Sequence, residues 1–202
     1  MTVDTDDLRA RAETGSAEAM AELATALYAG EREQQDYSEA LRWYSNAAEA
    51  GHTWSAYMVG VMHQEGLGTP QDLSAAIGWY QAAADKGLPL AALNLGIMAQ
   101  LGLGREVNMA EAARLYEQSA QAGNIRAAIN LGQLFQSGRL GDVDYVQAQR
   151  WYQLAAAAGS PQAEELLDQV QRFTQPKAWA MRRVTEMRRV PASRWDAIVG
   201  RR

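Results

Sequence analysis

Side chains that could act as nucleophiles or metal ligands are scarce in this chain of 202 residues. It contains no cysteine, and its only two histidines are His52 and His63. His63 is followed by Gln64 and Glu65, without the second histidine four residues on that a helical zinc protease site requires. A metal site also needs several converging ligands, and no His-rich or Cys-rich cluster is present. We therefore expect no enzyme, no cofactor and no metal.

Charge is distributed unevenly along the chain. The formal net charge is −5, but residues 174–202 hold eight basic and two acidic side chains, a net +6 that leaves −11 for residues 1–173. No apolar run is long enough for a membrane span. The acidic start "MTVDTDDLRARAETG" lacks the basic and apolar regions of a secretory signal. These features predict a cytoplasmic protein with an acidic body and a basic end.

A repeat of 36 residues organises most of the chain. Gly15, Gly51, Gly87, Gly123 and Gly159 recur at this spacing. The stretch "ALRWYSNAAEAG" returns as "AIGWYQAAADKG", "AARLYEQSAQAG" and "AQRWYQLAAAAG". Repetition at such a period is typical of solenoids, in which each unit packs on its neighbours.

Each unit has the pattern of two antiparallel helices, here called helix A and helix B. In the first helix B, Ala40, Trp43 and Tyr44 follow helical spacing. Asp36 precedes this helix as an N-cap, and Glu39 follows three residues later, as in a capping box. The equivalent N-caps are Asp72, Asn108 and Asp144, and the equivalent capping-box residues are Glu111 and Gln147.

Small residues of helix A predict close contact between helices. Gly60, Gly96 and Gly132 hold the same place in successive units, where we expect a tyrosine of helix B to fill the gap. The ends of the array carry partial units, the first at residues 7–14. The last follows Gly159, and there Asp168 replaces the small residue. A polar terminal unit limits growth of a repeat array.

The Trp-Tyr pair, the Gly-x-Gly loop and the 36-residue step together resemble the Sel-one-like repeat, a relative of the tetratricopeptide repeat. The loop is present in "EGLGTPQD" and "LGLGREVN", shifted in "SGRLGDVD" and absent from "AGEREQQD". The resemblance implies an all-α fold, a right-handed α-solenoid of four 36-residue repeats with partial capping repeats at both ends. It also implies a non-catalytic protein–protein interaction scaffold in residues 1–173, followed by a basic helical segment or tail at 174–202.

In tetratricopeptide-like arrays helix A lines the concave side, so its outward positions are the candidate site for a polypeptide partner. The residues assigned to this site are Trp54, Met58, Val61, Leu90, Asn94, Ile97, Arg126, Asn130 and Gln133. Trp54 and Met58 have no evident reason to face solvent, and aromatic and methionine side chains are enriched in interface cores. The alternative is that these side chains pack against neighbouring helices.

The segment 174–202 lies outside the repeat register. Pro176 and Pro191 are placed to begin and end a helix. Its candidate contact residues are Arg182, Arg183, Arg188 and Arg189. Docking on the chain's own array, binding a partner and weak binding to an anionic membrane surface all stay open as roles. Nucleic acid is disfavoured, because the acidic body repels it and no recognition motif accompanies the arginines.

Overall fold

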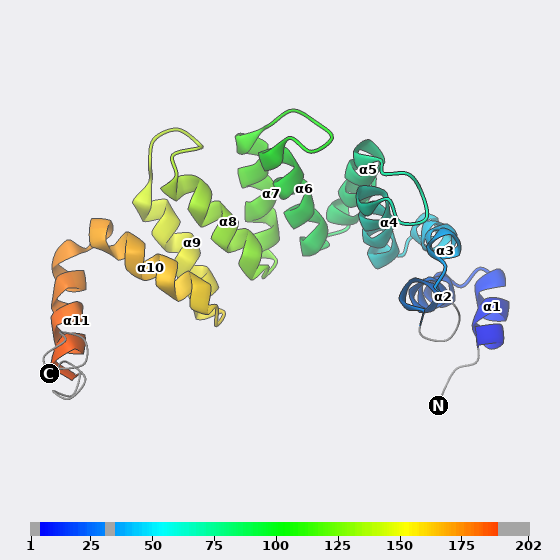
Figure 1. The fold of residues 1–202 in the computed structure, drawn as a ribbon, viewed down its shortest axis with the longest axis horizontal. Helices are drawn as coiled ribbons and strands as arrows, with labels where there is room; N and C mark the ends of the chain where they lie inside the picture. The colour runs from blue at the N-terminus through cyan, green and yellow to red at the C-terminus, as the bar shows by residue number, and fades with distance from the viewer. Residues whose placement is uncertain (1–4, 31–34, 190–202) are drawn as a thin grey trace, which may run out of the picture. The chain divides into compact units, whose positions relative to one another are not determined.

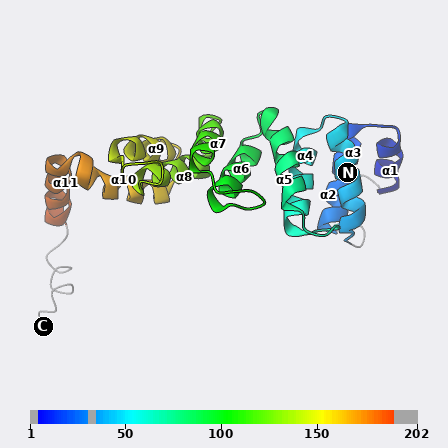
Figure 2. The same ribbon diagram turned by 90° about the horizontal axis from the view of Figure 1, so that it is seen from above.

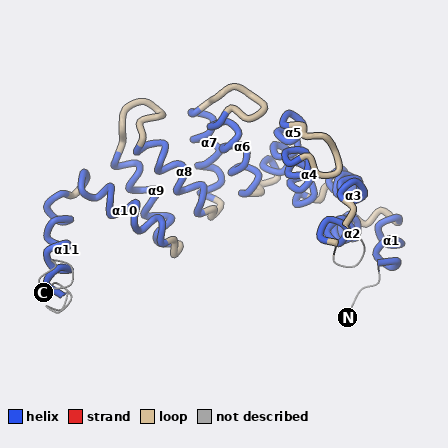
Figure 3. The backbone as a smooth tube through the Cα atoms, viewed as in Figure 1, coloured by secondary structure: helices blue, strands red, loops and turns tan. Residues whose placement is uncertain are grey.

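The structure is a computed structural model that describes the backbone of residues 5–30 and 35–189. These residues form helices joined by turns, and the described part contains no strand (Figure 3). The all-α fold expected from the repeat is therefore confirmed. Among the described residues, no helix combines the length and the apolar character needed to cross a bilayer.

The helices follow the repeat register closely (Figure 1). Their bounds are α1 Thr5–Glu13, α2 Ala17–Ala29, α3 Tyr37–Glu49, α4 Thr53–Glu65, α5 Leu73–Asp85, α6 Pro89–Leu101, α7 Met109–Gln121, α8 Ile125–Gln136, α9 Tyr145–Ala157, α10 Pro161–Thr174 and α11 Pro176–Arg189. The even-numbered helices from α2 to α10 are the A helices, and α3, α5, α7 and α9 are the B helices. The predicted partial units correspond to α1 and α10, and the helix expected from Pro176 is α11.

The chain divides into two compact units, residues 1–127 and 128–202. In the first unit each helix from α1 to α6 packs on the next one along the chain (Figure 2). In the second unit α9 packs on α10, and α10 packs on α11. The packing of helix A on helix B within a repeat is the arrangement that the sequence predicts.

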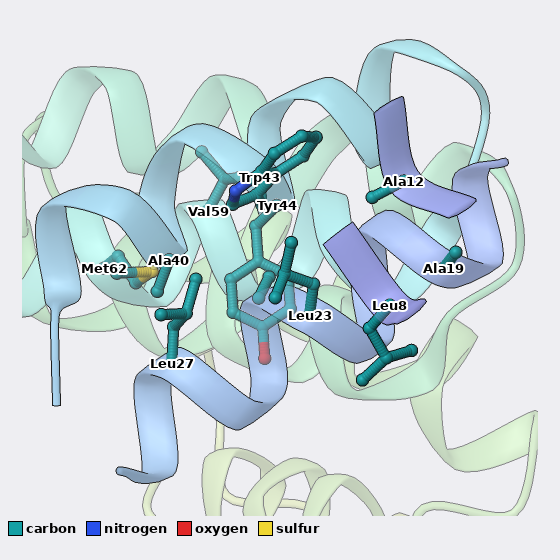
Figure 4. Packing of buried hydrophobic residues seen from close by; sticks show 11 residues of the cluster. Leu8, Ala12, Ala19, Leu23, Leu27, Ala40, Trp43, Tyr44, Val59 and Met62 are labelled. Atoms are coloured by element: carbon teal, nitrogen blue, oxygen red, sulfur yellow. The ribbon is translucent and has the colours of Figure 1, made fainter. Parts of the chain in front are cut away.

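Apolar side chains from four successive helices form the core at the start of the first unit. Leu8 of α1, Leu23 of α2, Tyr44 of α3 and Met62 of α4 are buried in one cluster, with the ring of Tyr44 near its centre (Figure 4). Leu8 has an exposed fraction of 3%. The partial unit α1 is therefore part of the core, and it shields apolar surface of α2 that would otherwise face water.

The glycines of helix A allow the close helix contact that the sequence predicts. A β-carbon built on Gly60 would lie 2.7 Å from the ring of Tyr80, and one built on Gly132 would lie 2.5 Å from the ring of Tyr152. The hydroxyl of Tyr80 donates to Gln64 Oε1 over 3.0 Å. The equivalent hydroxyls donate to Gln100 over 2.7 Å and to Gln136 over 2.6 Å. The glutamine column, which the sequence analysis missed, satisfies the hydroxyl of these three buried rings, whereas the hydroxyl of Tyr44 pairs with Thr25.

The predicted N-caps are confirmed, but the capping box is not formed at Glu39. Asp36 accepts a hydrogen bond from the backbone N–H of Glu39, 2.9 Å away. The N–H of Asp36, which a capping box would give to the Glu39 side chain, donates instead to the carbonyl of Leu27 at the end of α2. Glu39 accepts hydrogen bonds from Arg9 and from the indole N–H of Trp43, and the Arg9 bond lowers its pKa.

The N-caps of the other three B helices make the same hydrogen bond to the preceding helix A. The N–H groups of Asp72, Asn108 and Asp144 donate to His63, Ala99 and Phe135 respectively. Each N-cap therefore also satisfies a carbonyl near the end of the preceding helix A. The two helices of a repeat are therefore joined by this hydrogen bond as well as by apolar packing.

Candidate protein-interaction surface

Seven of the predicted site residues lie in the first unit and form a row on its A helices. We call this row the helix A face: Trp54, Met58, Val61, Leu90, Asn94, Ile97 and Arg126. Trp54 is 42% exposed, and Arg126 is exposed. The other five residues are partly buried. The row is thus accessible to a partner at both ends and half-buried between them.

Part of the row also belongs to the packing between helices. Met58 packs against the cluster that contains Tyr44, and Val61 packs against the next cluster along the first unit. The alternative reading of the sequence therefore applies to these two side chains in part. Trp54 is different, because it is a large aromatic side chain that stays exposed on a folded surface.

Trp54 stands beside a second aromatic ring that the sequence analysis did not assign to the site. Its ring centroid lies 5.0 Å from that of Tyr57, and Tyr57 lies 5.6 Å from Tyr80. Tyr57 is only partly buried, whereas Leu93 and Ile129, at the equivalent positions of later units, are buried. The hydroxyl group at this otherwise apolar position was the one available signal in the sequence.

Asn94 is anchored to this aromatic group. Burial raises the pKa of Tyr57, and a hydrogen bond with Asn94 and the positive charge of Arg126 partly oppose that rise. Burial also raises the pKa of Tyr80, again with an opposing hydrogen bond from Asn94. An amide that donates to a phenol oxygen keeps its own carbonyl oxygen as an acceptor. Asn94 is therefore a fixed polar group within a largely apolar row.

The first A helix, α2, is acidic at the positions that correspond to Trp54 and Met58, and these charges are partnered. Glu18 lies 3.6 Å from His52 Nε2, and Glu22 lies 3.9 Å from Arg11. His52 also caps α4, since its Nδ1 accepts the backbone N–H of Ser55 over 3.3 Å. The histidine thus has a structural role at the start of the helix that carries Trp54.

Within the part of the chain that the structure describes, no group of three or more His, Cys, Asp or Glu residues is placed to hold a metal ion. The side chains of the helix A face offer apolar contact, aromatic stacking, hydrogen bonding and the positive charge of Arg126.

In the second unit, the remaining predicted residues fall into two places. Asn130 is partly buried and Gln133 is exposed, both on α8. Arg182 and Arg183 of α11 reach Asp168 of α10, at 3.9 Å and 2.7 Å. The side chains of Arg188 and Arg189, and Pro191, lie outside the described residues.

Asp168 also accepts the indole N–H of Trp179 over 3.1 Å, and the guanidinium of Arg172 lies 4.9 Å from the centre of the Trp179 ring. The exposed residues of α11 around this contact include Met181. Among the described side chains, the contact of α11 with α10 centres on the indole of Trp179 and the carboxylate of Asp168, and Arg182 also donates to Gln171.

Comparison with known proteins matches the repeat register. A family model described as Sel1 repeat matches residues 17–52, 55–88, 89–124 and 125–160. A solved structure of c5321, a protective antigen of uropathogenic Escherichia coli, has a TM-score of 0.80 and 34% identity over 85% of this chain. A Sel1 repeat protein from Oxalobacter formigenes has a TM-score of 0.74 and 25% identity over 80% of this chain.

The chain spans 37% of the E. coli antigen and 66% of the Oxalobacter protein, less than two thirds of each. Cysteine rich protein B of Helicobacter pylori, at 21% identity over 62% of this chain and 96% of that one, has a TM-score of 0.50 and supports the fold alone. No functionally curated protein matches the sequence.

Proposed function

The chain belongs to the Sel1 repeat family, and from this premise we propose that it is a non-catalytic adaptor that binds an extended polypeptide on the helix A face. Proteins of this family are generally protein-interaction scaffolds. The binding face, the absence of catalysis and the cytoplasmic location expected from the sequence are parts of the proposal.

The observation that carries the proposal is the exposure of Trp54 beside Tyr57. An indole ring in water gains free energy when a partner covers it, at roughly 25 cal/mol for each Å² of apolar surface buried. Leu90 and Ile97 continue the apolar row on α6 and are partly exposed. A segment of extended chain could bury its side chains along this row while Asn94 binds its backbone.

The proposal is tested by removing the apolar contacts without disturbing the core. Trp54→Ser combined with Leu90→Ser removes the exposed indole and a partly exposed leucine of the row. Met58 is left unchanged, because it packs against buried residues. The matched control is Leu154→Ser, a change at an exposed leucine on helix B of the second unit.

Affinity capture with mass spectrometry should find partners that the wild-type protein and the control retain and the double variant loses. Each partner is then purified and its affinity measured by calorimetry. We expect a loss of tenfold or more in affinity, about 1.4 kcal/mol. Equal affinities for all three proteins would overturn the proposed binding face.

The second proposal concerns α11, which we propose is a clasp on the chain's own array. The contacts of Trp179 and Arg183 with Asp168 support it. Binding of the basic segment to an anionic surface is the alternative, and it requires these arginines to leave Asp168.

A further inference from the structure

We propose that the helix A face selects polypeptides in which a bulky apolar residue is accompanied by a nearby acidic residue, whose carboxylate pairs with Arg126. This inference rests on the proposed function and names the chemistry of its partner. It follows from the position and charge environment of Arg126, from the apolar residues in the same row and from the acidic groups elsewhere in the first unit.

Arg126 holds the same repeat position as Trp54 and Leu90, two repeats after Trp54 and one repeat after Leu90. The three side chains therefore follow one another on the same face of α4, α6 and the first turn of α8. Arg126 is near enough to Tyr57 for its charge to affect the phenol. A ligand side chain seated on Trp54 and Leu90 would thus have a guanidinium next to it.

Most arginines of the first unit have an acidic partner. Arg9 and Arg42 pair with Glu39, Arg11 pairs with Glu22, and Arg105 pairs with Glu111. Arg126 and Arg114, by contrast, are exposed and have no ion pair with any residue that the structure describes. Of these two arginines, only Arg126 lies on the helix A face, where its charge is available to a ligand.

The helix itself does not explain this arginine. Residue 126 lies in the first turn of α8, and a cation at a helix N-terminus is disfavoured by about 0.3–1 kcal/mol through the helix dipole. The side chain amide of Asn124 already accepts the N–H of Ala127, so the first turn is capped without it. Arg126 therefore contributes no evident stability to α8, which favours a role in binding.

The remaining charges of the first unit favour one orientation of the ligand. Glu18 and Glu22 hold the positions of Trp54 and Met58 one repeat earlier, on α2, where an acidic peptide residue would be repelled. Arg126, on the last A helix of the row, attracts a carboxylate. A peptide is therefore favoured when its acidic residue lies near Arg126 and away from α2.

The test uses a random peptide library displayed on phage, selected on the full-length wild-type protein. We expect enriched peptides to contain an aromatic or large aliphatic residue with Asp or Glu close by. Arg126→Glu should lower the affinity of these peptides about threefold to tenfold and favour versions with lysine in place of the acidic residue. Arg114→Glu makes the same charge change at an exposed arginine of α7, which has no ion pair with the described residues, and should leave affinity unchanged.

The possible results distinguish failure of the charge selection by Arg126 from failure of peptide binding on the helix A face. Enriched peptides that depend on Trp54 but show no acidic residue, or that bind Arg126→Glu as well as wild type, would overturn the charge selection alone. An equal loss in Arg114→Glu would indicate a general effect of net charge and would also overturn it. Enrichment of no peptide by the wild-type protein would overturn the proposed function itself.

Discussion

Gly96 of α6 lies against the ring of Tyr116 on α7, so closely that a β-carbon on Gly96 would be 2.6 Å from that ring. A glycine inside a helix costs up to about 1 kcal/mol relative to alanine. Glycine is nevertheless needed at this position, because the tyrosine ring occupies the space that a β-carbon would fill. The same contact recurs between Gly60 and Tyr80.

Replacement of this glycine should destabilise the first unit. Gly96→Ala forces the Tyr116 ring or one of the two helices to move, and overpacking of this kind costs about 1–3 kcal/mol. We expect a lower midpoint in urea unfolding followed by circular dichroism. The control is Gly78→Ala on α5, where an added β-carbon meets no atom within 4 Å. That variant should be as stable as wild type or more stable, and a fall equal to that of Gly96→Ala would contradict the packing explanation.

Alkaline pH should unfold the repeats through their buried tyrosines. Burial raises the pKa of Tyr44, Tyr80 and Tyr152 above the usual 10.0. The folded state therefore holds these protons more tightly than the unfolded state. Their contribution to stability is complete below pH 10 and is lost as the pH rises above it. Absorbance at the tyrosinate band and circular dichroism should change together in this range. Ionisation of all tyrosines near pH 10 with helicity intact would contradict the burial effect.

The hydroxyl of Tyr152 should contribute to stability through its glutamine. Tyr152→Phe leaves Gln136 Oε1 without its donor, 2.6 Å away in the wild type, at a cost of about 1 kcal/mol. Tyr145→Phe is the control, since Tyr145 stacks on Phe173 at 4.3 Å between ring centres and its hydroxyl makes no hydrogen bond with the described residues. Thermal unfolding of both variants compares the two effects. Equal midpoints would show that the glutamine column does not contribute to stability.

The 36-residue period was sufficient to predict the helix pairs, their N-caps and the glycine–tyrosine contacts. These features depend on residues within one unit, so their spacing is visible in the sequence. The capping box failed because the N–H of Asp36 reaches Leu27 on the preceding helix. A local pattern contains no information about such a partner, even when the residue types match.

Prediction of the binding surface from the sequence was limited for the same reason, because contacts with other helices decide which side chains are exposed. Helical spacing placed Trp54 and Arg126 on one face, but it could not separate fully exposed residues from half-buried ones such as Met58. Nor could it identify Tyr57, whose ring packs against those of Trp54 and Tyr80 and stays only partly buried. The partners of a side chain across helices decide its exposure, and the period alone does not specify them.

Neutralising Asp168 should loosen α11 from α10. Asp168→Asn removes the charge that Arg183 contacts at 2.7 Å and weakens the acceptor of the Trp179 indole. Exposed ion pairs contribute about 0.2–1 kcal/mol each, so the loss of the pairs at Asp168 weakens the attachment of α11 by an amount of this order. We therefore expect backbone amides of α11 to exchange with deuterium several-fold faster, while exchange in α9 stays the same. Added salt should speed exchange in the wild type, since it screens the same pairs. Glu165→Gln changes an exposed acidic residue of α10 and serves as the control. Slow exchange of α11 in Asp168→Asn at all salt concentrations would contradict the clasp at Asp168.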